Sequence, residues 1–253
     1  MEWAAPTWGE VGDDELRRIV VVSPHLDDAA RGAAHVIASH PDVTVITVMG
    51  GQPPSYPDPP TDWDARGGFA AGDDVVGVRR EEDRAAMDLL GATPVWLPFV
   101  DHQYLAPRQR ATSEEVSAAL TAAVAQAGAT AVFVPMGLAN PDHVVTHDAA
   151  RLVIDELPGL SWFAYQDAGY THLPGMLAWR VGALFRSGLW PTPAMVPIEP
   201  DEDLKRAAIE RYASQLPPLV EDHALADRLG AHVAEQYWRL APPPAGWEGL
   251  AEL

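Results

Sequence analysis

The chain has 253 residues, no cysteine and a formal net charge of −19. Its length suffices for one α/β domain with a full core, and a 47% hydrophobic content argues against disorder. The negative charge makes nucleic acid and anionic membrane surfaces poor partners. Without cysteine there is no disulfide and no thiolate metal site, so any metal must be held by histidine and carboxylate.

Strands and helices are predicted to alternate over the first two thirds of the chain. Runs rich in β-branched and other apolar residues predict strands at 18–23, 43–48, 94–97, 131–135 and 161–165. Between them, helices are expected at 28–39, 75–90, 112–126 and 142–155. Gly91 is placed to end the second of these helices, and Thr112 with Glu115 forms a capping box for the third. This alternation predicts an α/β, Rossmann-like, mostly parallel sheet with helices on both faces.

A long loop and the C-terminal third depart from this pattern. Residues 50–74 are rich in Gly, Pro, Asp and Ser, and loops of that length are usually functional or disordered. After residue 170 we expect strands at 176–185, 195–198 and 234–240, a helix at 201–214 and a peripheral tail at 241–253. We therefore expect a single domain over 1–253, with a core over 18–170 and a less regular part over 171–253.

Two clusters of chemically active residues follow predicted strands. His25, Asp27 and Asp28 come after the first strand, and Asp142 with His143 comes after the strand at 131–135. The C-terminal ends of parallel strands are where binding sites form. His25, Asp28 and His143 then offer two nitrogen donors and one oxygen donor with an open position, the ligand count of a catalytic zinc site. Asp27 is the candidate general base, and Asp142 can orient a ligand.

These clusters resemble two motifs of the LmbE-like, or PIG-L, family of zinc-dependent N-deacetylases. The family motifs are usually Pro-His-Pro-Asp-Asp-Glu and His-x-Asp-His, and here they are Pro24-His25-Leu26-Asp27-Asp28-Ala29 and Asn140-Pro141-Asp142-His143. Further segments resemble the family or one bacterial branch of it: 47–53, 62–69, 79–86, 101–104 and 212–215. The resemblance thus spans about residues 18–215.

The resemblance implies a Rossmann-like fold with one Zn²⁺ held by His25, Asp28 and His143, and Asp27 as the general base. It also implies hydrolysis of an N-acyl amide, commonly an acetyl group on an amino sugar. Members of the family act on N-acetylglucosaminyl lipids, thiol-conjugated glucosaminyl inositols and sugar-bearing natural products. The expected partner is therefore a small N-acylated amino-sugar conjugate.

One departure bears on the mechanism. Asn140 stands where the family has a histidine that stabilises the oxyanion or protonates the leaving amine. Asparagine can donate a hydrogen bond to an oxyanion but cannot deliver a proton at neutral pH, so Asn140 is expected to assist the oxyanion. The proton for the amine must come through Asp27 or from another residue, and the candidates are His102, His147 and His172.

Other functions stay open at this stage. An amidase for a larger acyl group and a metal-binding pseudoenzyme both fit the motifs, the latter because of Asn140 and Ala29. A nucleotide-binding Rossmann domain is disfavoured because no glycine fingerprint occupies the first strand-to-helix turn. Iron or nickel can also occupy a site of two histidines and one carboxylate.

Arg79, Asp142 and His172 are candidates for contact with substrate. The alternative for Arg79 is a buried ion pair with Glu82 or Asp83. The aromatic residues of the 50–74 loop suit a sugar ring or pack the loop onto the body, and Gln166, Asp167 and His172 follow the fifth strand. The sequence shows neither a signal peptide nor a transmembrane segment, so a cytoplasmic protein is expected, and a homo-oligomer is compatible with it.

Overall fold

The computed structural model describes residues 9–223 and 234–243. These residues form one seven-stranded sheet in the order β3-β2-β1-β4-β5-β7-β6. Its strands are β1 (Ile19–Ser23), β2 (Val43–Thr47), β3 (Thr93–Trp96), β4 (Ala131–Pro135), β5 (Ser161–Tyr165), β6 (Trp190–Ala194) and β7 (Tyr237–Ala241). The first five strands are parallel, whereas β7 runs antiparallel between β5 and β6. The predicted Rossmann-like, mostly parallel α/β fold is confirmed.

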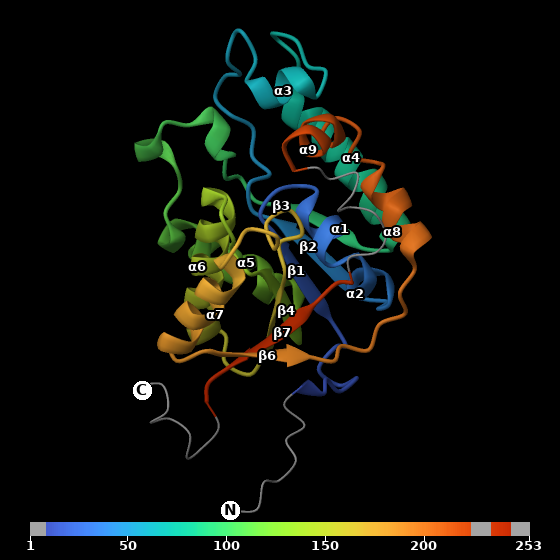
Figure 1. Cartoon of the computed structure of the whole chain (residues 1–253), viewed down its shortest axis with the longest axis vertical. Coiled ribbons are helices and arrows are strands. Elements are labelled where there is room, and N and C mark those ends of the chain that lie inside the picture. The colour runs from blue at the N-terminus through green and yellow to red at the C-terminus, as the bar shows by residue number, and fades with distance from the viewer. Residues whose placement is uncertain (1–8, 224–233, 244–253) are drawn as a thin grey trace, which may run out of the picture.

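Helices cover both faces of this sheet (Figure 1). One face carries α5 (Ser113–Ala127), α6 (Pro141–Glu156) and α7 (Met176–Arg186). The other carries α1 (Asp28–Gly32), α2 (Ala34–Ala38), α4 (Val75–Leu90) and α8 (Glu202–Ile209). The short helix α3 (Asp62–Arg66) lies in the long loop before α4 and contacts α9 (Leu216–His223). Two 3₁₀ turns, η2 (His102–Tyr104) and η3 (Pro107–Gln109), precede α5.

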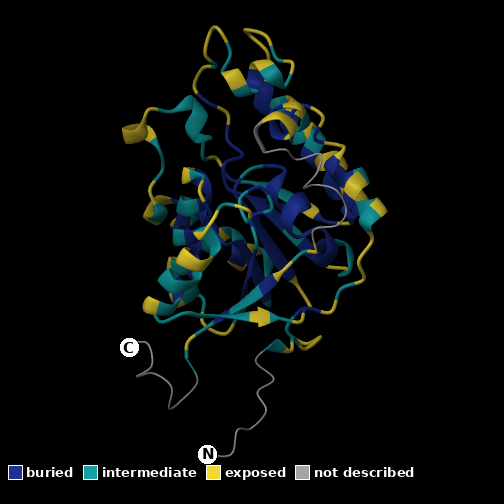
Figure 2. Cartoon of the chain, viewed as in Figure 1, coloured by how far each residue is buried: buried dark blue, intermediate teal, exposed yellow. Residues whose placement is uncertain are grey.

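The central strands are apolar on both sides because both sides are buried. In β1, Ile19 and Val21 belong to one apolar core, and Val20 and Val22 belong to the other. Figure 2 shows the central strands of the sheet as the buried centre of the molecule. Each fully buried aliphatic side chain of this size stabilises the fold by about 1.5–3 kcal/mol. The sheet is therefore a rigid platform for the side chains at its edge.

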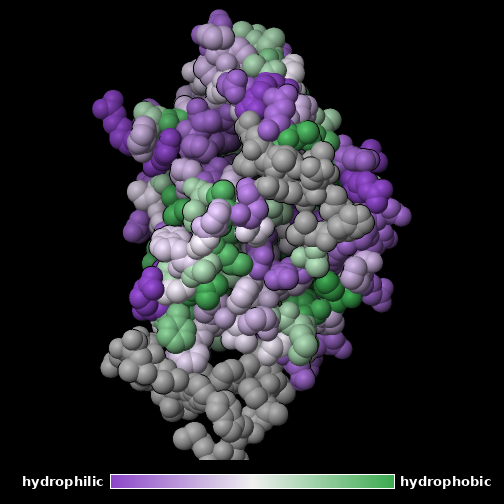
Figure 3. Space-filling model, in the orientation of Figure 1, coloured by the Kyte–Doolittle hydropathy of each residue, from purple (hydrophilic) through white to green (hydrophobic). Residues whose placement is uncertain are grey.

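The surface reflects the acidic composition. On the face drawn in Figure 3, hydrophilic side chains gather over α8, and apolar side chains form small separate groups. Among the helices of residues 9–223, none has both the length and the apolar character that crossing a membrane requires.

The expected helix at 28–39 is interrupted. It is divided into α1 and α2 at Ala33, whose backbone leaves the helical region at φ −144°. At the preceding Gly32, a Cβ atom would lie 2.6 Å from the Tyr165 ring, so the chain passes close to β5 there. The caps of the next two helices are confirmed, since Gly91 has φ 75° and Thr112 with Glu115 forms the capping box.

The C-terminal third differs most from expectation. The strand expected at 176–185 is wrong, because this segment is α7, whose apolar residues recur at helical spacing and pack on the core. The strand expected at 195–198 is also wrong, since β6 ends at Ala194. The helix expected at 201–214 is shorter, because α8 ends at Ile209. The strand expected at 234–240 is found as β7, and the last ten residues of the expected tail lie outside the described residues.

Candidate active site

The two sequence clusters meet where β1 and β4 lie side by side. His25 follows β1, and Asp28 begins α1, which leaves that strand. His143 lies in the first turn of α6, which follows β4. The turn after β1 is braced by Ser23, whose hydroxyl donates to the His25 carbonyl and accepts from the Ala29 amide. Neighbouring parallel strands therefore bring residues more than a hundred positions apart to one edge of the sheet.

His25, Asp28 and His143, hereafter the ligand triad, converge on one carboxylate oxygen. Asp28 Oδ2 lies 3.1 Å from His25 Nδ1 and 3.1 Å from His143 Nε2. Four ligands at about 2.0 Å from a tetrahedral zinc ion are separated from one another by roughly 3.3 Å. The three donor atoms are thus spaced as a group that can hold a metal ion.

Two further carboxylates, hereafter the backing carboxylates, hold the other side of each imidazole. Asp142 Oδ2 lies 3.0 Å from His25 Nε2, and Asp167 is hydrogen-bonded to His143 Nδ1. Metal-binding histidines usually donate their second ring N–H to such a partner, which fixes the ring and its tautomer. Asp142 therefore serves the distant His25 rather than its neighbour His143. The donor set and its surroundings fit a metal site.

The electrostatics of the triad favour positive charge. Burial lowers the pKa of His143, but the carboxylates of Asp28 and Asp167 outweigh it and raise that pKa to about 9. Burial raises the pKa of Asp28, yet the two imidazoles beside it hold that pKa well below its usual range. Carboxylates collected in a buried site thus attract cationic groups, whether protons or a metal ion.

Asp27 lies beside the triad and is paired with a buried cation. Its Oδ2 accepts a hydrogen bond from Arg31 Nη1 at 2.8 Å, and both side chains are less than a tenth exposed. Burial lowers the pKa of Arg31, but Asp27 and Asp28 outweigh it and raise that pKa. The guanidinium therefore stays charged and keeps Asp27 in one orientation.

A cavity of about 240 Å³ opens over the triad. Its walls come from the strand ends, from the loop before α4, from η2 and from the region of α9. The lining residues are His25, Asp27, Asp28, Arg31, Trp63, Asp101, His102, Gln103, Asn140, His143, Tyr170, Gln215 and Leu219.

Several of these lining residues were missed by sequence reasoning, which gave no site role to Arg31, Gln103, Tyr170, Gln215 or Leu219. The signal that was available for Gln103 is its place shortly after a parallel strand. Gln215 lies in the segment 212–215 that resembles the family, whereas Leu219 has no such signal, because the packing of α9 against α3 brings it to the cavity.

The three residues expected to contact substrate do not line this cavity. Arg79 is buried and forms an ion pair with Asp64 at 2.9 Å, rather than with either partner considered in the sequence. Asp142 is buried behind His25. His172 is exposed and is not part of the cavity lining.

Asn140 is the N-cap of α6, and its Oδ1 accepts from the Asp142 amide at 2.8 Å. Its side chain also hydrogen-bonds Tyr170, whose ring packs edge-on against His143. Asn140 therefore stays in the cavity lining, and its amide nitrogen carries two N–H donors, one of which serves Tyr170.

Comparison with known proteins decides the family. The model of the family described as "PIG-L: GlcNAc-PI de-N-acetylase" matches residues 20–154, slightly more than half of the chain. The chain belongs to the PIG-L family. It is an N-deacetylase, and its solved structural neighbours include deacetylases.

Three solved structures of deacetylases resemble this PIG-L protein over most of its length. A deacetylase of the teicoplanin biosynthesis pathway shares 26% identity at a TM-score of 0.71 and covers 90% of this chain and 100% of its own. A teicoplanin deacetylase in a zinc-inhibited form shares 25% identity at a TM-score of 0.67 and also covers 90% of this chain and 100% of its own. The A40926 pseudoaglycone deacetylase shares 26% identity at a TM-score of 0.68, covering 90% and 99%.

A more distant structure shares the fold. The N,N'-diacetylchitobiose deacetylase from Pyrococcus horikoshii is 20% identical, with a TM-score of 0.51 and coverage of 89% of this chain and 84% of its own. No curated protein sequence matches the PIG-L chain at a significant level.

Proposed function

We propose that the protein is a zinc-dependent N-deacetylase that removes an acetyl group from an amino-sugar conjugate. The observation that carries the proposal is the ligand triad with its backing carboxylates, placed in a cavity that also contains Asp27. Membership of the PIG-L family and the likeness to glycopeptide deacetylases support the same reaction.

His25, Asp28 and His143 are the residues that would hold the zinc ion. Two nitrogen donors and one oxygen donor leave a position for water or substrate, as in catalytic zinc sites. When bound there, zinc supplies a Lewis acid that polarises the acyl carbonyl and lowers the pKa of water. The backing carboxylates keep both imidazoles turned toward Asp28.

Asp27 is the proposed general base. Arg31 occupies its Oδ2, and its other oxygen has no hydrogen-bond partner among the described residues, so that oxygen is available to accept a proton from water. The adjacent guanidinium holds the Asp27 side chain in one orientation. Asn140 is proposed to donate its amide N–H to the oxyanion of the tetrahedral intermediate.

The cavity wall suits a sugar. Trp63 offers an aromatic face, and Gln103 and Gln215 offer amide groups that donate to and accept from hydroxyls. Arg79 acts in this proposal by holding the Trp63 segment to α4 through Asp64, rather than by touching substrate. His172 is left without a role in substrate binding.

Amine release from a matched substrate panel tests the proposal. The panel pairs N-acetylglucosaminyl glycosides of increasing aglycone size with the same compounds carrying longer N-acyl groups. Zinc-loaded protein is expected to release amine from the N-acetyl series. Turnover confined to longer acyl groups would favour the amidase alternative, and bound zinc without any turnover would favour a pseudoenzyme.

A further inference from the structure

The cavity contains one imidazole that is outside the ligand triad. His102 is the first residue of η2, and its side chain is about a quarter exposed, at 27%. His102 reaches the cavity from the segment that follows β3, whereas His143 follows β4. These two strands lie on opposite sides of β1 in the sheet order, so the two imidazoles approach the cavity from opposite sides.

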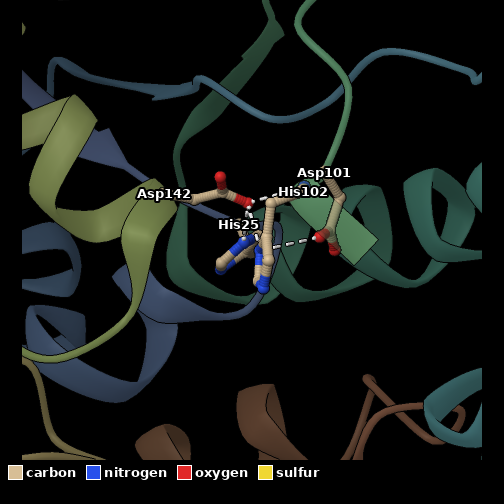
Figure 4. A group of neighbouring side chains, drawn as sticks. All are labelled: His25, Asp101, His102 and Asp142. Carbon is tan, nitrogen blue, oxygen red and sulfur yellow. Dashed lines mark hydrogen bonds and ion pairs between the residues drawn. The ribbon is translucent and has the colours of Figure 1, made fainter. Parts of the chain in front are cut away.

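Two carboxylates fix the orientation of this ring. Asp142 Oδ2 accepts from the His102 backbone amide at 3.0 Å and lies 2.9 Å from His102 Nδ1. Asp101 Oδ1 lies 3.3 Å from the same ring nitrogen. Figure 4 shows Nδ1 directed at these carboxylates, with the second ring nitrogen on the other side of the ring. Nδ1 is therefore the donor to the carboxylates, and Nε2 has no hydrogen-bond partner among the described residues.

The other histidines considered as proton donors are placed elsewhere. His147 is fully buried and its Nδ1 pairs with the Pro135 carbonyl, so it does not reach the cavity. His172 is exposed outside the cavity. Asn140 lines the cavity but carries no transferable proton. Asp142, two residues after Asn140, instead holds His102 in the cavity.

We propose that His102 gives the proton from Nε2 to the leaving amine, which makes it a catalytic residue that compensates for Asn140. The inference rests on the proposed function. The surroundings of His102 support the proposal, because the hydrogen bonds to Asp101 and Asp142 raise the pKa of His102 to about 9 against the effect of burial. The ring then carries both protons at neutral pH.

The step balances as an amide hydrolysis. Asp27 takes one proton from water as the new C–O bond forms. When the C–N bond breaks, its electron pair goes to nitrogen, which takes the proton from His102 Nε2. Solvent then returns a proton to His102 and removes the one on Asp27. The sum is amide plus water giving a carboxylic acid and an amine, which exchange a proton through solvent to become a carboxylate and an ammonium ion.

The test compares two leaving groups in His102→Gln. Glutamine keeps a hydrogen-bond donor but cannot transfer a proton. The substrates are an N-acetyl amino sugar, whose amine must be protonated to leave, and p-nitrophenyl acetate, whose phenolate leaves without a proton. We expect kcat for the amide to fall by about 10²–10³-fold and kcat for the ester to change by less than about 3-fold, with zinc content unchanged.

Two variants serve as controls. Asp27→Asn is expected to lower both activities, and His172→Gln is expected to lower neither. Imidazole added to His102→Ala is expected to restore part of the amide hydrolysis, which a purely structural role would not allow.

Two results would overturn the inference alone: undiminished amide hydrolysis in His102→Gln, or an equal loss on both substrates. A wild-type enzyme inactive on both would overturn the proposed function, and this inference with it.

Discussion

The ligand triad and the outer wall of the cavity are built in different ways. The triad is attached to the ends of adjacent parallel strands, and each imidazole is held on its far side by a backing carboxylate. The wall residues Trp63 and Leu219 come from helices in segments between or after the strands. The sheet therefore positions the chemistry, and the connecting segments shape what reaches it. A wall of this kind can change without moving the triad.

The wall is nevertheless anchored by its own polar contacts. Asp64, in the same short helix as Trp63, pairs with Arg79 at 2.9 Å and accepts from the Tyr104 hydroxyl at 2.8 Å. The Thr61 hydroxyl donates to the Gln103 side chain at 2.8 Å. These bonds connect the loop before α4 to η2 and to α4. Changes in or beside the triad should therefore affect kcat or zinc binding, and changes in the wall should affect KM.

Loss of the base should have the largest effect. Asp27→Asn is expected to lower kcat by about 10²–10⁴-fold, because the amide cannot take a proton from water. The zinc content should not change, because Asp27 is outside the triad. Steady-state kinetics and metal analysis check both points, with the exposed Asp62→Asn as the control. A variant that keeps full activity would exclude Asp27 as the base.

Loss of a backing carboxylate should have an intermediate effect. Asp167→Asn is expected to weaken zinc binding by about 10–100-fold, because the amide holds His143 less firmly than the carboxylate. Competition with a chelator of known affinity measures this, and the exposed Asp155→Asn is the control. Unchanged affinity in Asp167→Asn would mean that His143 does not depend on its partner.

A change in the wall should affect binding more than chemistry. Trp63→Ala is expected to raise KM by roughly 5–10-fold, since an aromatic contact contributes about 1–1.5 kcal/mol. Its kcat should remain within about twofold of the wild type. Trp63→Phe should retain most of the binding, and the exposed Trp179→Ala should change neither constant. If kcat fell instead, the wall and the triad would not be separable.

The smallest effect is expected far from the cavity and on stability alone. The hydrogen bond from Arg239 lowers the pKa of Glu15 to about 2, so the folded state favours the charged form. The stabilisation of the fold by the Glu15–Arg239 pair is present above the ordinary pKa of 4.5 and is lost as the pH falls through 2.

Glu15→Gln is accordingly expected to lower the free energy of unfolding by about 1 kcal/mol at pH 7, given partial exposure, and by nearly nothing at pH 2. Denaturant titrations at the two pH values measure the difference. Equal losses at both would contradict the assigned cause, and kcat should be unaffected.

The sequence predicted the parallel half of the sheet well because its strands are buried on both faces and read as continuous apolar runs. It failed at α7, where the mostly apolar segment 176–185 predicts a strand although its packing follows a helical period. Short apolar runs do not by themselves distinguish the two.

For the site, the sequence located every member of the triad, but not the pairings made across the fold. Asp142 is expected from the sequence to touch substrate or orient a ligand, but which histidine it holds depends on the pairing of β1 with β4, which brings His25 beside the start of α6. Arg79 similarly found a partner in the loop before α4 rather than in its own helix. The cytoplasmic location, the single domain and a homo-oligomer stay predictions.

The central claim is tested most directly by the zinc content of purified wild-type protein and His143→Ala, with amine release from N-acetyl amino sugars measured in the same samples. The account predicts about one zinc per chain in the wild type, as for a single catalytic zinc site, together with amine release. His143→Ala should lose both. A wild-type protein that contains no metal, and takes up none on reconstitution, would contradict the claim.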